Sequence, residues 1–206
     1  MPTNTHITGL ILAGGRARRM EGQDKGLIPL HGEPMVRHVF ERLLPQVDNI
    51  LINANRNIET YQQYAPVIRD SIADYAGPLA GMLAGLEHIE EGYLLCVPCD
   101  SPFIPADLAQ RMLSQAKKQA SMIAVATDGN RLQPVFVLLH HSLKASLANY
   151  LDRGDRKIDL WYAEHDYTQV DFSDQIDAFI NINSAEELAQ VEQQIAKGKP
   201  HVTASL

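Results

Sequence analysis

Short apolar runs of strand length alternate along this chain with longer segments of helical periodicity. The strand-like runs are residues 7–12, 49–53, 66–69, 93–97, 122–127, 134–139 and 178–182. The clearest helical segments are residues 35–44, 79–89, 106–119, 143–151 and 185–197. Strands that alternate with crossover helices are typical of parallel sheets. The pattern therefore predicts an α/β fold, with a mostly parallel sheet and helices on both faces.

Length and local signals favour one domain. The 206 residues, 45% of them hydrophobic, suffice for one substantial core and are few for two. No repeat, low-complexity run or flexible linker divides the sequence. We expect a single domain over residues 1–197 and a loose tail over residues 198–206, which have no periodicity. The last helix has a defined start, because Ser184 followed by Glu187 forms a capping box.

Net charge and the lack of targeting signals limit the classes of binding partner that we expect. A formal net charge of -7 argues against nucleic acid, because phosphate backbones are bound by clustered lysine and arginine. Small anionic ligands need only a local basic pocket. The N-terminal residues do not resemble a signal peptide, and no apolar run approaches the roughly 20 residues of a membrane span. We expect a cytoplasmic location, no membrane partner and, with two cysteines, no disulfide framework.

The segment LILAGGRARRMEGQDKGL, residues 10–27, places glycines and cations directly after the first predicted strand. Gly14 and Gly15 can take positive φ angles and let backbone N–H groups approach an anion. Cationic side chains that can hold phosphate oxygens follow, namely Arg16, Arg18, Arg19 and Lys25. We favour a phosphate-binding loop over a glycine turn with a solvated charged face. Neither the Walker A pattern nor the G-x-G-x-x-G fingerprint fits, because Gly26 follows Lys25 and the two glycines are adjacent.

Polar residues end three further predicted strands. Asp100 follows the apolar run in YLLCVPCDSPF, where a carboxylate can hold Mg²⁺ together with substrate phosphates. The alternative is that Asp100 caps the next helix or begins a turn with Ser101. Asp70 and Asn53 also end strands, and the Asn53 amide offers a donor and an acceptor to a base or a ribose. Ligands of open α/β sheets bind beyond the carboxyl ends of the strands, so these residues predict one site.

Two turns allow two interpretations each. Gly77, Pro78 and Gly81 shape the turn that opens the predicted helix at 79–89. Its glycines either permit close helix packing or leave a surface free of side chains for a flat ligand. The segment DRGDRK, residues 152–157, is either an anion-facing loop or a solvated charged turn.

The cysteines and histidines give little sign of a metal site. Cys96 and Cys99 have the C-x-x-C spacing of redox pairs and zinc sites, but no second cysteine pair exists. We favour buried packing for Cys96, because it lies within an apolar strand. The eight histidines are scattered, and His140 with His141 has no cysteine partners.

Taken in order, the motifs LAGG, RRM, DKGL, GPLAG, PCDSPF and NIN resemble those of the molybdenum cofactor guanylyltransferases over nearly the whole chain. The resemblance implies a Rossmann-like α/β domain of the nucleotidyltransferase type. It implies transfer of GMP from GTP to the terminal phosphate of molybdopterin, with Mg²⁺ and release of pyrophosphate. It also implies a handover from molybdenum-insertion proteins and to apo-oxidoreductases.

The resemblance also assigns residues. Those expected at the nucleotide are Leu12, Ala13, Gly14, Gly15, Lys25, Asn53, Asp70 and Asp100, of which Asp100 holds the metal. Those expected on the acceptor side are Gly77, Pro78, Gly81, Asn181 and Asn183. One position departs from the family pattern, since Glu21 stands where a glycine usually follows Arg19-Met20. We expect the Glu21 carboxylate to point outward and leave the bend to Gly22.

Phosphoryl-transfer chemistry then predicts a mechanism. The acceptor phosphate is itself an anionic nucleophile, so no serine, histidine or cysteine nucleophile is needed. We expect in-line attack on the α-phosphorus, with Mg²⁺ on Asp100 while Lys25 and Arg19 stabilise charge on the pyrophosphate.

The choice of base and the activity itself have alternatives. The family resemblance links LAGG to guanine and LAAG to cytosine enzymes, and Gly15 would leave room for a purine. One alternative is another nucleotidyltransferase of this fold, which uses CTP or a sugar phosphate. Another is a non-catalytic nucleotide-binding regulator, although Lys25 and Asp100 together favour an enzyme.

Overall fold

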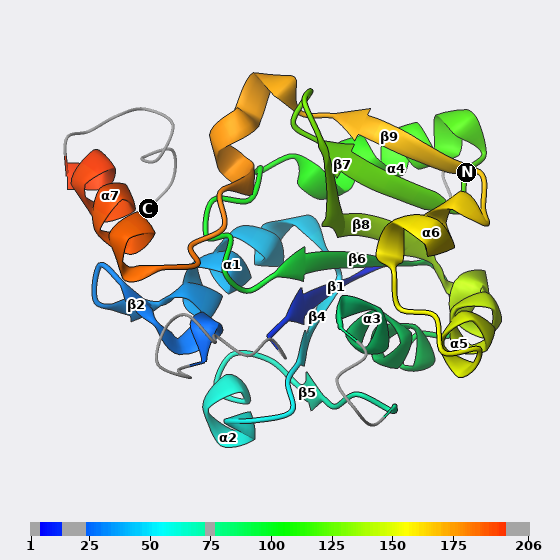
Figure 1. Cartoon of the computed structure of the whole chain (residues 1–206), viewed down its shortest axis with the longest axis horizontal. Helices are drawn as coiled ribbons and strands as arrows, with labels where there is room; N and C mark the ends of the chain where they lie inside the picture. Colours follow the sequence, from blue (N-terminus) through cyan, green and yellow to red (C-terminus); the bar gives the residue numbers. More distant parts are fainter. Residues whose placement is uncertain (1–4, 14–23, 73–76, 197–206) are drawn as a thin grey trace.

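Seven strands form one sheet in the order β5-β4-β1-β6-β8-β7-β9 (Figure 1). The computed structural model describes residues 5–13, 24–72 and 77–196. The strands of the sheet are β1 (Ile7–Leu12), β4 (Asn49–Asn53), β5 (Val67–Ile68), β6 (Tyr93–Pro98), β7 (Ile123–Thr127), β8 (Leu132–His140) and β9 (Tyr167–Asp171). Strand β8 runs antiparallel to both of its neighbours, β6 and β7, and the other neighbouring pairs are parallel. The sheet is therefore mostly parallel, as the pattern predicts.

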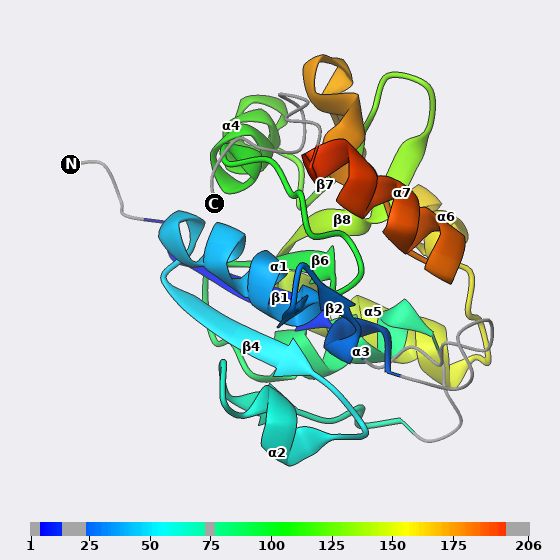
Figure 2. The ribbon, with the colours of Figure 1, turned by 90° about the vertical axis from the view of Figure 1, so that its left-hand side faces the viewer.

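Alternating side chains of the central strands enter two different cores. Leu10 and Cys96 face one core, and Ile11 and Val97 face the other. The first core is covered by α3 (Pro78–Glu87), α5 (Lys144–Asp152) and α6 (Ile158–Ala163), and the second by α1 (Met35–Leu43) and α4 (Leu108–Gln119). Figure 2 shows α1 and α4 on one side of the sheet and α3 on the other. Because successive residues of a strand point to opposite faces, a sheet covered on both sides needs these continuous apolar strands.

Helix α7 (Ala185–Ala196) covers a third, smaller core that contains Val191. The predicted capping box is formed in part, because the Glu187 N–H donates to Ser184 Oγ at 3.2 Å. The Glu187 carboxylate accepts from the N–H of Asn183 at 2.6 Å instead of from that of Ser184. The start of α7 is thereby joined to a residue of the predicted site.

The predicted strand at 178–182 is wrong. Residues Ser173–Phe179 form 3-10 turns with a kink at Gln175, and the last strand of the described residues is β9, which was not predicted. Phe179 enters the core beneath α4, whereas Ile182 enters the core beneath α7, so the apolar residues of this run serve two clusters instead of one sheet face. The other predicted elements are present with bounds shifted by up to two residues. Further elements that were not predicted are α2 (Ile58–Tyr61), α6 and the antiparallel pair β2 (Pro29–Leu30) and β3 (Glu33–Pro34).

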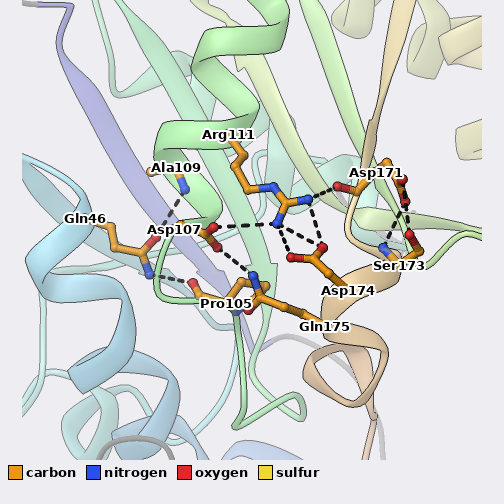
Figure 3. A network of polar contacts seen from close by, with 9 residues as sticks. All are labelled: Gln46, Pro105, Asp107, Ala109, Arg111, Asp171, Ser173, Asp174 and Gln175. Atoms are coloured by element: carbon orange, nitrogen blue, oxygen red, sulfur yellow. Dashed lines mark hydrogen bonds and ion pairs between the residues drawn. The ribbon is translucent and has the colours of Figure 1, made fainter. Parts of the chain in front are cut away.

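A polar network joins α4 to the segment that follows β9 (Figure 3). Arg111 donates to both carboxylate oxygens of Asp174, at 3.0 and 3.1 Å, and its guanidinium lies 4.1 Å from the centre of the Phe172 ring. Gln175 donates to the Asp107 carboxylate at 3.0 Å. The guanidinium also lowers the pKa of the Asp174 carboxyl through their hydrogen bond. These contacts hold the start of the chain segment that leads to Asn181.

Candidate active site

A cavity of about 750 Å³ lies at the carboxyl ends of β1, β4 and β6. The chain proceeds from β1 to β4 and β5 on one side of β1 and then crosses to β6 on the other side. This is the topological switch point of the sheet, where crevices of open α/β folds bind their ligands.

Most of the predicted site residues that the structure describes line this cavity. They are Leu12, Lys25, Asn53, Asp70, Gly77, Pro78, Asp100, Asn181 and Asn183. The predicted residues Gly14, Gly15 and Arg19, together with Arg16, Arg18, Glu21 and Gly22 of the same loop, lie outside the described residues. The structure thus brings together residues that are more than 150 positions apart in the sequence, such as Lys25 and Asn183.

Lys25 connects the two sides of the cavity. Its ammonium group donates to Asp100 Oδ2 at 2.9 Å and to Asn183 Oδ1 at 2.5 Å. The side chains of Lys25 and Asp100 are 23% and 12% exposed, so water screens this ion pair only in part. The Asp100 carbonyl accepts from the N–H of Ile182 at 2.9 Å, which ties the Asn183 segment to the end of β6.

Of the two alternatives for Asp100, a helix cap and a turn, the structure excludes the cap, whereas Asp100 does lie in a turn after β6. Helix α4 begins at Leu108, and its N-cap residue is Asp107, so Asp100 does not cap this helix. The carboxylate of Asp100 instead faces the cavity and contacts Lys25.

A second polar group lies at the ends of β4 and β5. Asn53 Nδ2 donates to Asp70 Oδ1 at 2.9 Å, and Asn55 Nδ2 donates to Asp70 Oδ2 at 2.8 Å. The N–H of Asp70 returns a hydrogen bond to Asn55 Oδ1 at 3.1 Å. Asn55 was not predicted, although it stands two positions after Asn53 in the motif NANRN. The carboxylate and the two amides form one hydrogen-bonded polar edge of the site.

Two predicted residues do not line the cavity. Ala13 is 2% exposed, and its N–H donates to the Asn53 carbonyl at 2.8 Å, so this donor is already used between strand ends. Gly81 is buried within α3, and a Cβ atom there would lie 2.3 Å from Asn53 Oδ1 and 2.6 Å from Leu12 Cδ2. Of the two interpretations of Gly81, the structure supports close helix packing and not an open surface for the acceptor. Gly77, in contrast, lines the cavity with a φ of 72°.

One wall of the cavity was missed by the sequence analysis. It consists of residues of β8 and the position before it, namely Arg131, Leu132, Gln133, Pro134, Val135 and Phe136. The sequence of this stretch is typical of the beginning of a strand and does not indicate a binding site. It reaches the site because β8 is antiparallel to β6, which places the amino end of β8 beside the carboxyl end of β6. Gln133 is held there by a 2.8 Å hydrogen bond to Asp128 Oδ2.

The segment 152–157 forms a charged turn that does not line the cavity. Arg153 pairs with Glu164 at 2.6 Å, and Arg156 donates to the Leu151 carbonyl at 2.8 Å. The anion-facing interpretation of this segment is therefore not supported.

The cysteines are free and buried. Burial raises the pKa of the Cys96 and Cys99 thiols, so neither is a ready thiolate at neutral pH. Within the described part of the chain, no three histidine, cysteine or acidic side chains gather as a metal site. Any metal at Asp100 would need ligands from its substrate as well.

A mostly parallel sheet with a polar cavity at its switch point places this protein among the α/β proteins that have a ligand site beyond the ends of their strands. Residues 9–168 match the family described as "MobA-like NTP transferase domain". The chain belongs to this family and, within it, to the molybdenum cofactor guanylyltransferases.

Named relatives support this grouping. A "Molybdenum cofactor guanylyltransferase" from Shewanella piezotolerans is 51% identical over 194 residues, which are 94% of this chain and 95% of the relative. One from Shewanella sediminis is 51% identical over 192 residues, 93% of this chain and 98% of the relative. The crystal structure of molybdopterin-guanine dinucleotide biosynthesis protein A from Archaeoglobus fulgidus has a TM-score of 0.76 at 20% identity, and covers 92% of this chain and 99% of its own. The likeness confirms the predicted nucleotidyltransferase fold.

Proposed function

We propose that this protein transfers GMP from GTP to the terminal phosphate of molybdopterin. The observation that carries the proposal is the 51% identity, over 94% of the chain, to a relative named for guanylyl transfer. In the reaction an oxygen of the acceptor phosphate bonds to the α-phosphorus of GTP. The bond from that phosphorus to the β-phosphate oxygen breaks, and pyrophosphate leaves with the electron pair.

The cavity offers a group for each part of this reaction. The Asn53–Asp70–Asn55 edge has amide and carboxylate groups that suit the hydroxyls of a ribose or the edge of a base. Lys25 supplies the positive charge that the developing pyrophosphate requires. Gly77, Pro78, Asn181, Asn183 and the wall formed by residues 131–136 remain for the acceptor.

The residues around Asp100 suit a magnesium ion. The Asp100 carboxylate is 12% exposed and already pairs with the cationic Lys25, so the position favours positive charge. Carboxylate and phosphate oxygens are the ligands that Mg²⁺ prefers, and Asp100 would hold the ion together with substrate phosphates. When bound, Mg²⁺ would neutralise charge on the phosphate oxygens. Lys25, beside Asp100, would contact the leaving pyrophosphate.

The proposed guanylyl transfer also suggests the location and the protein partners of this enzyme. Within the described residues, no helix has the length and apolarity to cross a membrane. We expect a cytoplasmic enzyme that exchanges its cofactor with molybdenum-insertion proteins and apo-oxidoreductases, with neither membrane nor nucleic acid as a partner.

The assay that tests this function measures pyrophosphate release with Mg²⁺ and each of GTP, CTP, ATP and UTP, with and without molybdopterin. We expect release only with GTP and molybdopterin together. Release with CTP would keep the fold and reaction class but overturn the choice of base. No release with any pair would favour a nucleotide-binding regulator.

Replacing Gly81 with alanine should weaken nucleotide binding. The new Cβ would collide with Asn53 Oδ1 at 2.3 Å and displace the amide from Asp70. We expect a loss of about 1–3 kcal/mol of stability from overpacking, measured by denaturant unfolding, and a higher Kd for GTP by calorimetry.

Gly85→Ala is the matched control for this variant. It lies one turn further along α3, where a Cβ would meet Leu94 Cδ2 at 2.7 Å in the core, away from Asn53. It should cost stability but leave the Kd for GTP unchanged. Equal Kd values for the two variants would contradict the role assigned to Asn53.

A further inference from the structure

A buried carboxylate stands directly before Lys25. Asp24 is 7% exposed, yet its two carboxylate oxygens both accept hydrogen bonds. Tyr61 Oη donates to Oδ1 at 2.5 Å, and Asn57 Nδ2 donates to Oδ2 at 3.1 Å. A buried carboxylate without hydrogen-bond donors would cost free energy, and these two donors offset that cost. Asp24 is therefore fixed to the segment that contains α2.

The donor is a side chain from a distant part of the sequence. Tyr61 has no exposed surface and lies at the end of α2, 37 positions after Asp24. Burial raises the pKa of its hydroxyl, so the group stays protonated and acts as a donor. Nothing in the predicted mechanism uses this buried hydroxyl.

Tyr61 also touches the residue after Lys25. A Cβ atom at Gly26 would lie 2.5 Å from Tyr61 Oη and 3.3 Å from Cys99 Sγ. The turn Lys25–Leu27 thus fits between the tyrosine hydroxyl and the residue that precedes Asp100. The N–H of Leu27 closes this turn by donating to the Asp24 carbonyl at 3.0 Å.

We propose that Tyr61 is a positioning residue for the transfer reaction, because its hydroxyl holds Asp24 and so fixes the backbone from which Lys25 reaches the phosphates. This role rests on the proposed function of Lys25. Tyr61 has no exposed surface and does not line the cavity, so its role is indirect. It joins α2, which follows the nucleotide-side residues Asn53 and Asn55, to the turn that carries the catalytic ammonium group.

Tyr61→Phe tests the role, because it removes the hydroxyl and keeps the ring. With GTP and molybdopterin we expect kcat to fall about 10- to 100-fold while the KM for GTP changes by less than about twofold, since a misplaced group costs transition-state stabilisation. Asn57→Gly removes the weaker donor, and glycine tolerates the φ of 50° found there, so this variant keeps its fold. Its kcat should fall several-fold less than that of Tyr61→Phe.

Tyr150→Phe is the matched control. Tyr150 is 2% exposed, and its hydroxyl donates to the Lys157 carbonyl at 2.8 Å, away from the cavity. Tyr150→Phe should lose about as much stability as Tyr61→Phe, as measured by thermal unfolding, while its kcat stays at the wild-type value. An equal fall in kcat for Tyr61→Phe and Tyr150→Phe, or an unchanged kcat in Tyr61→Phe, would overturn the proposal.

A second measurement separates this proposal from the proposed function. Acetic anhydride acetylates the unprotonated amino groups of lysines that it can reach, so loss of the contacts of Lys25 with Asp100 and Asn183 would speed its labelling. Mass spectrometry measures each site without any substrate. We expect Lys25 to be labelled several-fold faster in Tyr61→Phe than in the wild type, with Lys117 as an unchanged internal reference. Equal labelling of Lys25 in both proteins would refute the positioning role. Absence of pyrophosphate release by the wild type would refute the proposed function, and the labelling result would still test the positioning role.

Discussion

Replacing Lys25 with alanine should lower the rate of pyrophosphate release about 100- to 1,000-fold, because the ammonium group stabilises charge that develops on the leaving group. The structure places this group 2.9 Å from Asp100, and because the Lys25 side chain is only 23% exposed, water screens its charge only in part. Steady-state assays with GTP, Mg²⁺ and molybdopterin would measure the effect. The fold should be retained, since the ammonium contacts cavity-lining side chains and not the cores.

Lys117→Ala provides the control for Lys25→Ala. Lys117 lies on α4, and its ammonium group donates to Thr5 Oγ1 at 2.6 Å, so its removal deletes a lysine and a hydrogen bond outside the cavity. This variant should turn over like the wild type. If Lys25→Ala kept a near-normal kcat with an intact circular-dichroism spectrum, the role given to Lys25 would have to be abandoned.

Replacing Asp100 with asparagine should lower kcat about as much as Lys25→Ala does, but for a different physical reason. The amide keeps the shape of the side chain but removes the charge that would hold Mg²⁺, so kcat should fall about 100- to 1,000-fold at a fixed low magnesium concentration. Raising the magnesium concentration should restore part of the activity of Asp100→Asn, but not that of Lys25→Ala. Titrations of both variants with MgCl₂ would measure this difference.

Asp48→Asn is the control for Asp100→Asn. Asp48 directly precedes β4, at the amino ends of the strands and away from the cavity. Its carboxylate accepts from the N–H of Ile7 at 2.8 Å. Its magnesium dependence should equal that of the wild type. A wild-type magnesium dependence in Asp100→Asn would instead show that Asp100 does not hold the ion.

The fold could largely be predicted from periodicity. Strand β6 is a continuous apolar run, and β1 is one except for Thr8, because helices cover both faces of the sheet; this pattern is local in the sequence. The run at 178–182 was misassigned because its apolar residues pack into separate clusters, a fact that no local pattern contains. Strand β9 was missed because three of its five residues are polar or charged and because, among the described strands, it pairs with β7 alone.

The sequence by itself determined that Asn53, Asp70 and Asp100 meet at one edge of the sheet, since each follows a strand and the carboxyl ends of parallel strands share an edge. It did not determine which other segments reach that edge. The wall at 131–136 depends on the insertion of β8 in the opposite direction beside β6, and strand order is a product of long-range packing. In the same way, Gly81 packs against Asn53 and Tyr61 holds Asp24 only because distant segments meet in the tertiary structure. The chemical groups of each residue can be identified from the sequence, because they belong to that residue alone. The residues that each side chain contacts depend on which distant segments the folded chain brings together.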